Sequence, residues 1–433
     1  MQLRYKLRLA GRYLRGHFRR YIFLLIALSF GFSLITALTS ISNGMIDNVY
    51  TGAETHYGGH LFILGFDKDH DTAIRITDDA LVSAAVAASD IEYEKIVRRT
   101  NCFERGVIYF NGKAVRQKNV FGIDIENETD SFPDTGFDAE TAGAVGLPWI
   151  MLSKMTAEEL HLQSGDKVIL EVETITGQKN TAECLVTAVM NDSSLFGSFR
   201  SFTDRRFLND LMGMAQDEYS SMGLYFRNLR GIGEKARRLQ AAVETVLPAA
   251  PEIAEKADLT YQLSQQWPGI RYFVVSLPVY MSEIVDLISA LEAGSYAAFA
   301  VLALILLASS LVTYRLLLHE RRTEIATMRA LGFHGRTILN ILFFEGAGLA
   351  VISVLIGYLL SRLIIMLLSL FSYGSIPGFE IFLNNGRLTS SLPPELFIVN
   401  IAVVFATVGL AMIFPAGRSV RHDLAKALSG GDF

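Results

Sequence analysis

The amino-acid sequence predicts an α-helical integral membrane protein with four transmembrane helices. A large mixed α/β extracytoplasmic domain is expected as an insertion between helices 1 and 2. Hydrophobic residues make up 51% of the chain and charged residues only 19%, whereas about a quarter of the residues in soluble domains are charged. Four stretches are apolar over about 20 residues, the length that a helix needs to cross a bilayer. The long segment between the first two stretches is acidic, so it is expected to lie in water.

The four apolar stretches are the candidate membrane spans. They cover residues 21–41, 293–318, 337–371 and 396–414. The first contains no charged residue, and no small-residue cleavage site follows it. It is also longer than the apolar part of a signal peptide. We therefore expect it to remain in the mature protein as a transmembrane helix.

The distribution of Lys and Arg predicts which parts of the chain face the cytoplasm. Residues 1–20 hold seven basic and no acidic residues, the loop after span two holds four arginines, and the C-terminal tail holds three basic residues. The loop between spans three and four holds Arg387 alone. Short cytoplasmic loops are rich in Lys and Arg, so both termini and the loop after span two are expected in the cytoplasm.

These boundaries divide the chain into segments. Between residues 42 and 292 there are 22 basic and 37 acidic residues, a formal charge of −15, which gives no reason to expect a nucleic-acid partner. The predicted segments are a basic cytoplasmic tail (1–20), helix 1 with a stalk (21–52), the α/β domain (53–276), a stalk with helix 2 (277–318), a cytoplasmic helix (319–336), helix 3 (337–371), an extracytoplasmic loop (372–395), helix 4 (396–414) and a cytoplasmic tail (415–433).

Alternating apolar residues and turn signals predict the elements of the α/β domain. Asn111 and Gly112 are a hairpin signal, and turns are also expected at Gly165 and Gly177. The predicted strands cover residues 60–66, 107–110, 114–125, 167–175, 181–190 and 222–227. The predicted helices cover residues 153–162, 203–212 and 233–247.

The acidic run that starts at Asp67 is the feature of this domain that most resembles a metal site. Asp67, Asp69 and Asp71 match the start of a calcium-binding loop, but Thr72 stands where the turn of that loop needs glycine. A solvated acidic turn is therefore the favoured interpretation. We predict no metal site in this chain.

Other chemistry-bearing residues are scattered. His56, His60 and His161 are expected at the surface rather than as ligands, and the sequence contains no HExxH, GxSxG or CxxC motif. We therefore predict no catalytic residues and no enzyme activity in this chain. Cys102 and Cys184 are 82 residues apart and form no recognisable framework, so whether they pair remains open.

Two ionisable residues, Glu345 and Arg362, fall inside the third apolar stretch. If the span proper covers residues 343–363, both lie at its ends and can reach the lipid headgroups. This interfacial interpretation is the favoured one. A buried, functional Glu345 is the alternative.

Apolar residues at heptad spacing extend spans one and two outside the membrane. Their 4–3 spacing predicts two helices that pair as a stalk beneath the α/β domain. A single amphipathic helix packed on the domain is the alternative. The residues are Leu34, Leu38, Ile41 and Met45 on the first helix, and Leu277, Met281, Ile284, Ile288 and Leu291 on the second.

The loop after span two has the pattern of a charged amphipathic helix that ends at Gly332. Such a helix can lie in the headgroup layer or dock in a groove on a cytoplasmic partner, and composition leaves both open. Its apolar face holds Ile325, Met328 and Leu331, and the remaining surface holds Glu320, Arg321, Arg322, Glu324 and Arg329.

The same loop carries a motif. The segment ERRTEIATMRALG (320–332), followed by Ile338, Glu345 and Gly346, resembles the permease signature of the FtsX/MacB/LolC–LolE superfamily of ABC transporters. Within it, the lipoprotein-releasing (LolC/LolE-like) permeases are the most similar branch. Their sequences resemble this chain at RYLR (12–15), SNG (42–44), LQSGD (162–166) and RSVRHDLAKAL (418–428).

The resemblance implies a mechanism called mechanotransmission in a bacterial inner membrane. ATP closes a dimeric cytoplasmic ABC ATPase, the loop helix couples that motion to the permease, and the stalk helices move the extracytoplasmic domains. The lipoprotein-releasing branch extracts lipoproteins from the membrane. The expected partners are the ATPase, a second permease copy or homologue that completes a dimer, a periplasmic lipoprotein carrier and membrane lipid.

The sequence lacks a GxxxxGK[ST] phosphate-binding loop. We therefore expect ATP and magnesium to bind the ATPase on a separate subunit, and no cofactor to bind this chain. Two alternatives stay open for the function. One is an FtsX-like regulator of envelope enzymes driven by a partner ATPase, and the other is a membrane sensor without an ATPase.

Overall fold

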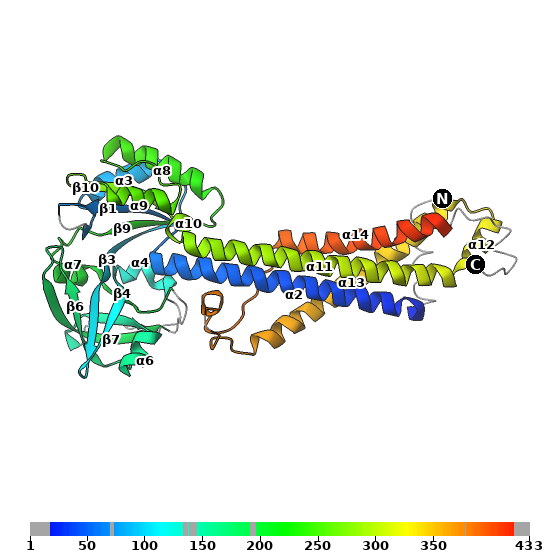
Figure 1. Cartoon of the computed structure of the whole chain (residues 1–433), viewed down its shortest axis with the longest axis horizontal. Helices are drawn as coiled ribbons and strands as arrows, with labels where there is room; N and C mark the ends of the chain where they lie inside the picture. Colours follow the sequence, from blue (N-terminus) through cyan, green and yellow to red (C-terminus); the bar gives the residue numbers. More distant parts are fainter. Residues whose placement is uncertain are drawn as a thin grey trace. The chain divides into compact units, whose positions relative to one another are not determined.

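The computed structural model describes residues 18–69, 73–132, 137, 145–190, 196–376 and 378–419. The chain divides into two compact units, whose elements are labelled in Figure 1. We call them the helical unit and the α/β unit. The helical unit consists of the described residues of Met1–Ile46, Ser289–Ser372 and Leu388–Phe433, and the α/β unit consists of those of Asp47–Ile288 and Tyr373–Arg387.

Apolar helices build the helical unit. Four helices in the described part of the chain are long and apolar enough to cross a membrane, and they fall on the four predicted spans. The first two, α2 and α11, continue into the α/β unit. The helices are α2 (Phe18–Tyr57), α11 (Ser282–Glu320), the short α12 (Arg322–Ala330), α13 (Gly335–Ser369) and α14 (Pro394–Ser419).

The core of the helical unit is a continuous apolar cluster to which α2, α11, α12, α13 and α14 all contribute. On α2, Leu24, Leu28 and Ile35 are fully buried in this cluster, because their spacing of four and seven residues places them on one helix face. Phe23 lies off that face and is 76% exposed. Exposed apolar side chains of this kind are expected where a helix faces lipid.

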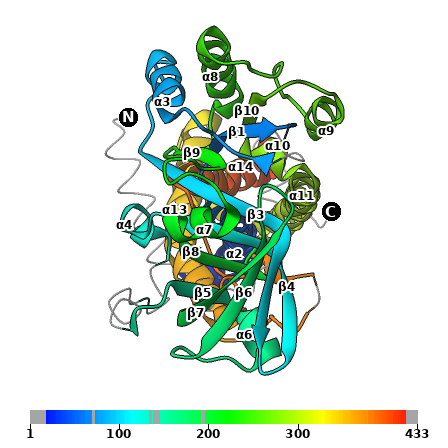
Figure 2. The same cartoon turned by 90° about the vertical axis from the view of Figure 1, so that its left-hand side faces the viewer.

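A mixed β-sheet forms the centre of the α/β unit. Its strand order is β10-β1-β9-β3-β4-β8-β5-β7-β6, and β3 also pairs with β6. Strands β3, β4, β8, β5, β7 and β6 therefore close into a barrel, whereas β10, β1 and β9 extend from β3 as an open sheet (Figure 2). The strands are β1 (Leu61–Asp67), β2 (Ala73–Ile74), β3 (Lys95–Phe110), β4 (Lys113–Ile123), β5 (Trp149–Ser153), β6 (Lys167–Glu173), β7 (Lys179–Met190), β8 (Arg200–Asp204), β9 (Ser221–Tyr225) and β10 (Ile270–Ser276).

Strand β3 belongs to both parts of the sheet. Its first residues pair with β9, up to Arg99 opposite Ser221. From Thr100 onward it pairs with β4, with a bulge between Phe103 and Gly106. The crossing from open sheet to barrel therefore falls between Arg99 and Thr100.

Helices cover both parts of the sheet. Helices α3 and α8 pack on the open sheet in one apolar cluster (Figure 2), and α6 and α7 contribute to the core of the barrel. The remaining elements are short connections. The helices of this unit are α3 (Asp79–Ala88), α4 (Ile125–Glu128), η1 (Thr129–Ser131), α6 (Lys154–Leu160), α7 (Arg205–Met212), α8 (Ile232–Val246), α9 (Lys256–Ser264), α10 (Leu277–Tyr280) and η2 (Glu380–Phe382).

Most predicted elements of the α/β unit are present, including the hairpin in which Phe110 pairs with Lys113 around Asn111 and Gly112. The helix predicted over 203–212 starts only at Arg205. Thr203 and Asp204 are in β8 instead, because the Asp204 carboxylate caps the helix by accepting a hydrogen bond from the amide of Phe207 at 2.9 Å.

Three polar expectations for this unit were wrong. His56 and His60 are buried, and only His161 of the three histidines is exposed. Asp67 is also buried, because its carboxylate pairs with the Arg75 guanidinium at 2.6 Å instead of facing solvent. Asp71 and Thr72 lie outside the described residues.

The two cysteines are buried and free, so they do not form a disulfide.

The second stalk helix is interrupted. Leu277 lies in the short α10, Met281 separates α10 from α11, and the backbone angles of Met281 are φ −109° and ψ 30°. The helix that continues into span two therefore starts at Ser282. The expectation of one unbroken helix from Leu277 onward was wrong, because the residues with heptad spacing lie on two helices, α10 and α11, that Met281 separates.

Candidate functional site

The predicted cytoplasmic helix is α12, between two breaks. Arg321 separates it from α11, and Gly332 follows it with φ +86°, a conformation that favours glycine. The amide of Gly332 donates to the carbonyl of Arg329 at 3.0 Å. The sequence prediction that Gly332 ends this helix is thus close, since α12 stops at Ala330.

Arg321 is the centre of a buried polar network that joins three helices of the helical unit. Its Nη1 donates to Glu345 Oε2 on α13 at 2.6 Å and to the Tyr21 hydroxyl on α2 at 2.9 Å. The Tyr21 hydroxyl in turn donates to Glu345 Oε2 at 2.9 Å. Arg321 Nε donates to Glu324 Oε2 on α12 at 3.0 Å. One guanidinium therefore connects α12 to α2 and α13.

Burial makes this network sensitive to change. The side chains of Arg321 and Glu345 are only 4% and 2% exposed. Removing one member of a buried ion pair typically costs about 3–5 kcal/mol, because the other charge stays buried without compensation. Any movement of α12 that separates Arg321 from Glu345 has to meet a similar cost unless water or a partner replaces the contact.

The helices pack closely beside the network. A Cβ at Gly346 would lie 2.5 Å from both the Tyr314 hydroxyl of α11 and the Met412 sulfur of α14. No side chain fits there without displacing its neighbours. The glycine next to Glu345 therefore lets α13 approach α11 and α14 at the level of the ion pair.

The three predicted apolar residues of α12 do not share one environment. Ile325 is buried in the core of the helical unit and Met328 packs against it. Leu331 is 73% exposed. The expectation that all three fill a partner's groove does not hold for this structure, because the chain's own core occupies two of them.

The charged residues of the motif also divide. Arg321 was predicted on the charged surface of this helix and is buried instead. Glu320 and Arg322 are exposed, and Glu324 and Arg329 are half-buried.

The interfacial interpretation of Glu345 was wrong. The side chain is buried, because Arg321 and Tyr21 turn it into the helix contact. Arg362, by contrast, is exposed on α13. Tyr21 was missed, although a tyrosine at the end of an apolar stretch on the same predicted side as the ERRTEIATMRALG motif was a usable signal.

The predicted stalk residues lie on α2, α10, α11 and the break between the last two. Met45 and Ile288 are buried, whereas Leu38, Ile41, Ile284 and Leu291 are half-buried. Leu277 and Met281 are buried within the α/β unit. In the part of the chain that the structure describes, no group of three or more His, Cys, Asp or Glu side chains could hold a metal ion.

Comparison with protein families matches the helical part of the chain. Residues 296–424 match the family described as FtsX-like permease C-terminal. This family belongs to ABC-type transporters and is the superfamily that the loop motif indicates. The match supports a permease subunit, and the layout of four apolar helices with a large α/β domain between the first two fits it. Among curated proteins, none matches this chain.

Solved structures resemble this chain only weakly. The extracellular domain of the noncanonic ABC-type transporter YknZ from Gram-positive bacteria is 14% identical, with a TM-score of 0.28, over 43% of this chain and 92% of that one. The periplasmic region of MacB from Actinobacillus actinomycetemcomitans is 11% identical, with a TM-score of 0.30, over 52% of this chain and 92% of that one. The functional argument therefore rests on the helical unit.

Proposed function

We propose that this chain is the permease subunit of an ABC transporter that works by mechanotransmission. In this proposal it extracts lipoproteins, or another hydrophobic envelope substrate, from the outer leaflet of a bacterial inner membrane. The match of residues 296–424 to FtsX-like permeases supports the permease role. The similarity of its short motifs to lipoprotein-releasing permeases supports the substrate class.

The contact of Arg321 with Glu345 at 2.6 Å is the observation that carries the mechanism. Through it, α12 is held to the first and third apolar helices rather than lying loosely in the headgroup layer. A force that acts on α12 would then reach α2 and α13 directly. This is the arrangement that a coupling helix needs.

The ATPase is proposed to bind the exposed side of this coupling helix. Because the core of the helical unit occupies Ile325 and Met328, the contact surface is left to Glu320, Arg322 and Leu331, which are exposed. Both termini are proposed to be cytoplasmic, as the Lys and Arg distribution predicts. ATP and magnesium would bind the separate ATPase, and a second permease would complete the dimer.

Co-purification tests the ATPase surface. Leu331→Asp should remove the associated ATPase from the purified permease, because it places a charge at the exposed apolar residue. The matched control is Leu370→Asp, since Leu370 is also exposed, near the far end of α13, and predicted on the other side of the membrane. Retention of the ATPase at wild-type stoichiometry in Leu331→Asp would rule out this surface.

Release of lipoprotein tests the substrate. Spheroplasts depleted of this chain should retain an acylated lipoprotein in the inner membrane, and the wild-type chain should restore its ATP-dependent release. Normal release after depletion, combined with lost cell-wall hydrolase activity, would instead identify an FtsX-like regulator. The wild-type complex and the Leu331→Asp variant should give opposite results in the same assay.

A further inference from the structure

The last turn of α2 is embedded in the α/β unit. The carbonyl of Glu54 accepts hydrogen bonds from the amides of Gly58 at 2.8 Å and Gly59 at 3.0 Å. It also accepts one from the hydroxyl of Tyr225 at 3.1 Å, on β9. Gly58 has φ +84°, as expected of a glycine that follows a helix. The end of α2 is therefore fixed both by its own turn and by the open sheet.

Arg99 adds a second attachment from the barrel side. Its Nη1 donates to the carbonyl of His56 in the last turn of α2 at 3.0 Å, and its Nε donates to Glu128 Oε2 at 3.0 Å. A Cβ at Gly58 would lie 2.7 Å from Arg99 Nε. The guanidinium thus fills the space directly behind the end of the helix.

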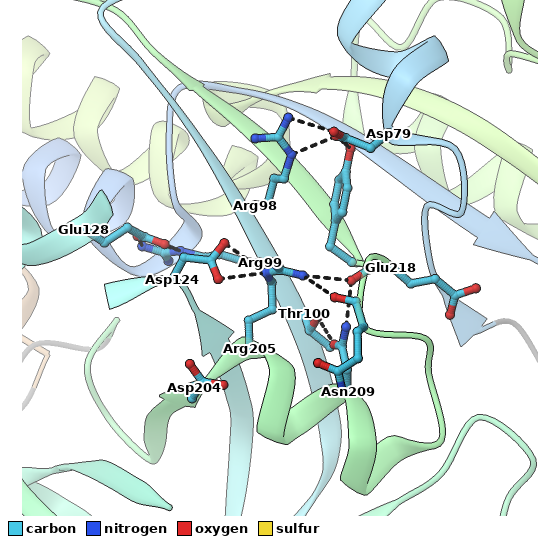
Figure 3. A network of polar contacts seen from close by, with 12 residues as sticks. Asp79, Arg98, Arg99, Thr100, Asp124, Glu128, Asp204, Arg205, Asn209 and Glu218 are labelled. Carbon is cyan, nitrogen blue, oxygen red and sulfur yellow. Dashed lines mark hydrogen bonds and ion pairs between the residues drawn. The ribbon is translucent and has the colours of Figure 1, made fainter. Parts of the chain in front are cut away.

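The position of Arg99 in the sheet makes this contact unusual. It is the residue at which β3 passes from the open sheet to the barrel, and its ion pair lies in the polar network of Figure 3. Its neighbour Arg98 points to Asp79 instead, at 2.7 Å (Figure 3). A displacement of the end of α2 would therefore act on both parts of the sheet at one point.

Electrostatics favour a cation here. Arg99 is only 1% exposed. Although burial opposes its charge, the adjacent Glu128 carboxylate raises the pKa of Arg99. The carbonyl end of a helix also attracts positive charge. The guanidinium caps α2 while its charge stays balanced by Glu128.

Helix α11 enters the same unit differently. Met281 precedes it with non-helical angles of φ −109° and ψ 30°. Hydrogen bonds still cross this residue, since its amide donates to the carbonyl of Leu277 at 3.0 Å and the amide of Val285 donates to the carbonyl of Met281 at 3.0 Å. Before the break, the amide of Leu277 donates to the carbonyl of His60 at 2.8 Å. The chain is thus held on the α/β side of the break, while α11 proper starts after it.

We propose that Arg99 and Glu128 are positioning residues that fix α2 to the α/β domain as a rigid lever, and that Met281 is the hinge through which α11 follows. The inference deepens the mechanotransmission proposed above and rests on it for its functional meaning. It assigns the two stalk helices different tasks. The helix α2 drives the domain, and α11 tethers it.

Distances between spin labels test the joint in the full chain, without ATP or a substrate. One label pair is placed at Thr51 on α2 and Lys118 on β4, and a second pair at Asp286 on α11 and Lys118, all of which are exposed. Cys102 and Cys184 should not react, since burial raises the pKa of each thiol to about 12. The first pair should give a narrow distance distribution and the second a broader one.

The double variant Arg99→Leu, Glu128→Leu removes the cap without leaving a buried charge. It should at least double the width of the Thr51–Lys118 distribution and leave the Asp286–Lys118 width unchanged. Arg98→Leu, Asp79→Leu removes the neighbouring ion pair and should leave both widths unchanged. Thermal melts of the full chain identify any variant that fails to fold.

An unchanged Thr51–Lys118 width in the folded Arg99→Leu, Glu128→Leu variant would overturn the proposal. So would equal widths for the two pairs in the wild-type chain. Neither result depends on whether the protein releases lipoproteins. The experiment therefore tests the attachment of α2 separately from the lipoprotein function. Either proposal can fail while the other holds.

Discussion

Proline at two places in α11 should separate the continuous helix that tethers the α/β domain from the turn that precedes it. Ala290 lies in the interior of α11, with an exposed side chain. In an α-helix the amide of residue 290 donates to the carbonyl four residues earlier. Ala290→Pro removes that hydrogen bond and clashes with the preceding turn, at a cost of about 3 kcal/mol or more. Since each 1.4 kcal/mol is a factor of ten, the straight helix should lose about 100-fold in relative population.

Ile284→Pro is the matched control. Ile284 is the third residue of α11. The amides of the first helical turn have no carbonyl partner within their own helix, so proline is tolerated there. Its amide donates to Met281 at 2.8 Å, and the loss of one such hydrogen bond costs about 1 kcal/mol. The same substitution should therefore cost roughly a third as much at residue 284 as at residue 290.

The assay uses the permease with the ATPase that co-purifies with it. Both proline variants should assemble and hydrolyse ATP, because neither residue lies near α12 in the sequence. Ala290→Pro should lose ATP-dependent lipoprotein release from spheroplasts, and Ile284→Pro should retain most of it. Normal release by Ala290→Pro would refute the idea that an unbroken α11 is needed, and equal loss in both would refute the hinge at Met281.

Three further predictions concern single contacts. Glu345→Gln should destabilise the helical unit by up to about 3–5 kcal/mol, because Arg321 loses its buried carboxylate and keeps only the half-buried Glu324 as an ion-pair partner. Glu345→Gln with Arg321→Gln should recover most of this loss in melts of the detergent-solubilised chain. Cys184 should resist maleimide labelling at pH 7 until the chain is unfolded, because burial raises the pKa of its thiol to about 12. The pKa of Asp79 is lowered, since hydrogen bonds from Arg98 and Tyr219 outweigh its burial. Its stabilising effect is thus present above the unfolded value of about 4 and lost as pH falls below it, so Asp79→Asn should lower the melting temperature more at pH 7 than at pH 3.

The sequence could predict the membrane helices because each apolar residue of a span contributes to the prediction independently of its neighbours in the fold. Each span needs only about 20 apolar residues, and the structure has an apolar helix of sufficient length at all four places. The hairpin at Asn111 was equally local, since two residues determine its turn. Strands such as β5 and β10 were missed because they are buried runs without alternation, a pattern that does not separate a strand from a helix.

The polar interior could not be predicted, because it depends on which residues meet. Glu345 looked interfacial as long as Arg321 was a loop residue 24 positions away. Once the two meet, burial is offset by the ion pair, and the same residue becomes part of the core. His56 is a similar case. Its side chain is buried, with its ring 5.9 Å from that of Phe202, a residue 146 positions away in the chain.

The heptad seams show how far a correct pattern can lead to a wrong mechanical conclusion. Spacing of four and three predicts which residues share a helix face, and it gives equal weight to Leu277 and Ile284. The backbone does not, because Met281 leaves the helix between them. A lever requires a helical backbone throughout rather than continuity of apolar residues. Hydrogen bonds alone do not ensure it, because the amide of Met281 still donates to the carbonyl of Leu277 at 3.0 Å. On that criterion α2, one helix from Phe18 to Tyr57 with Arg99 at its end, is the better candidate to carry a displacement to the α/β domain.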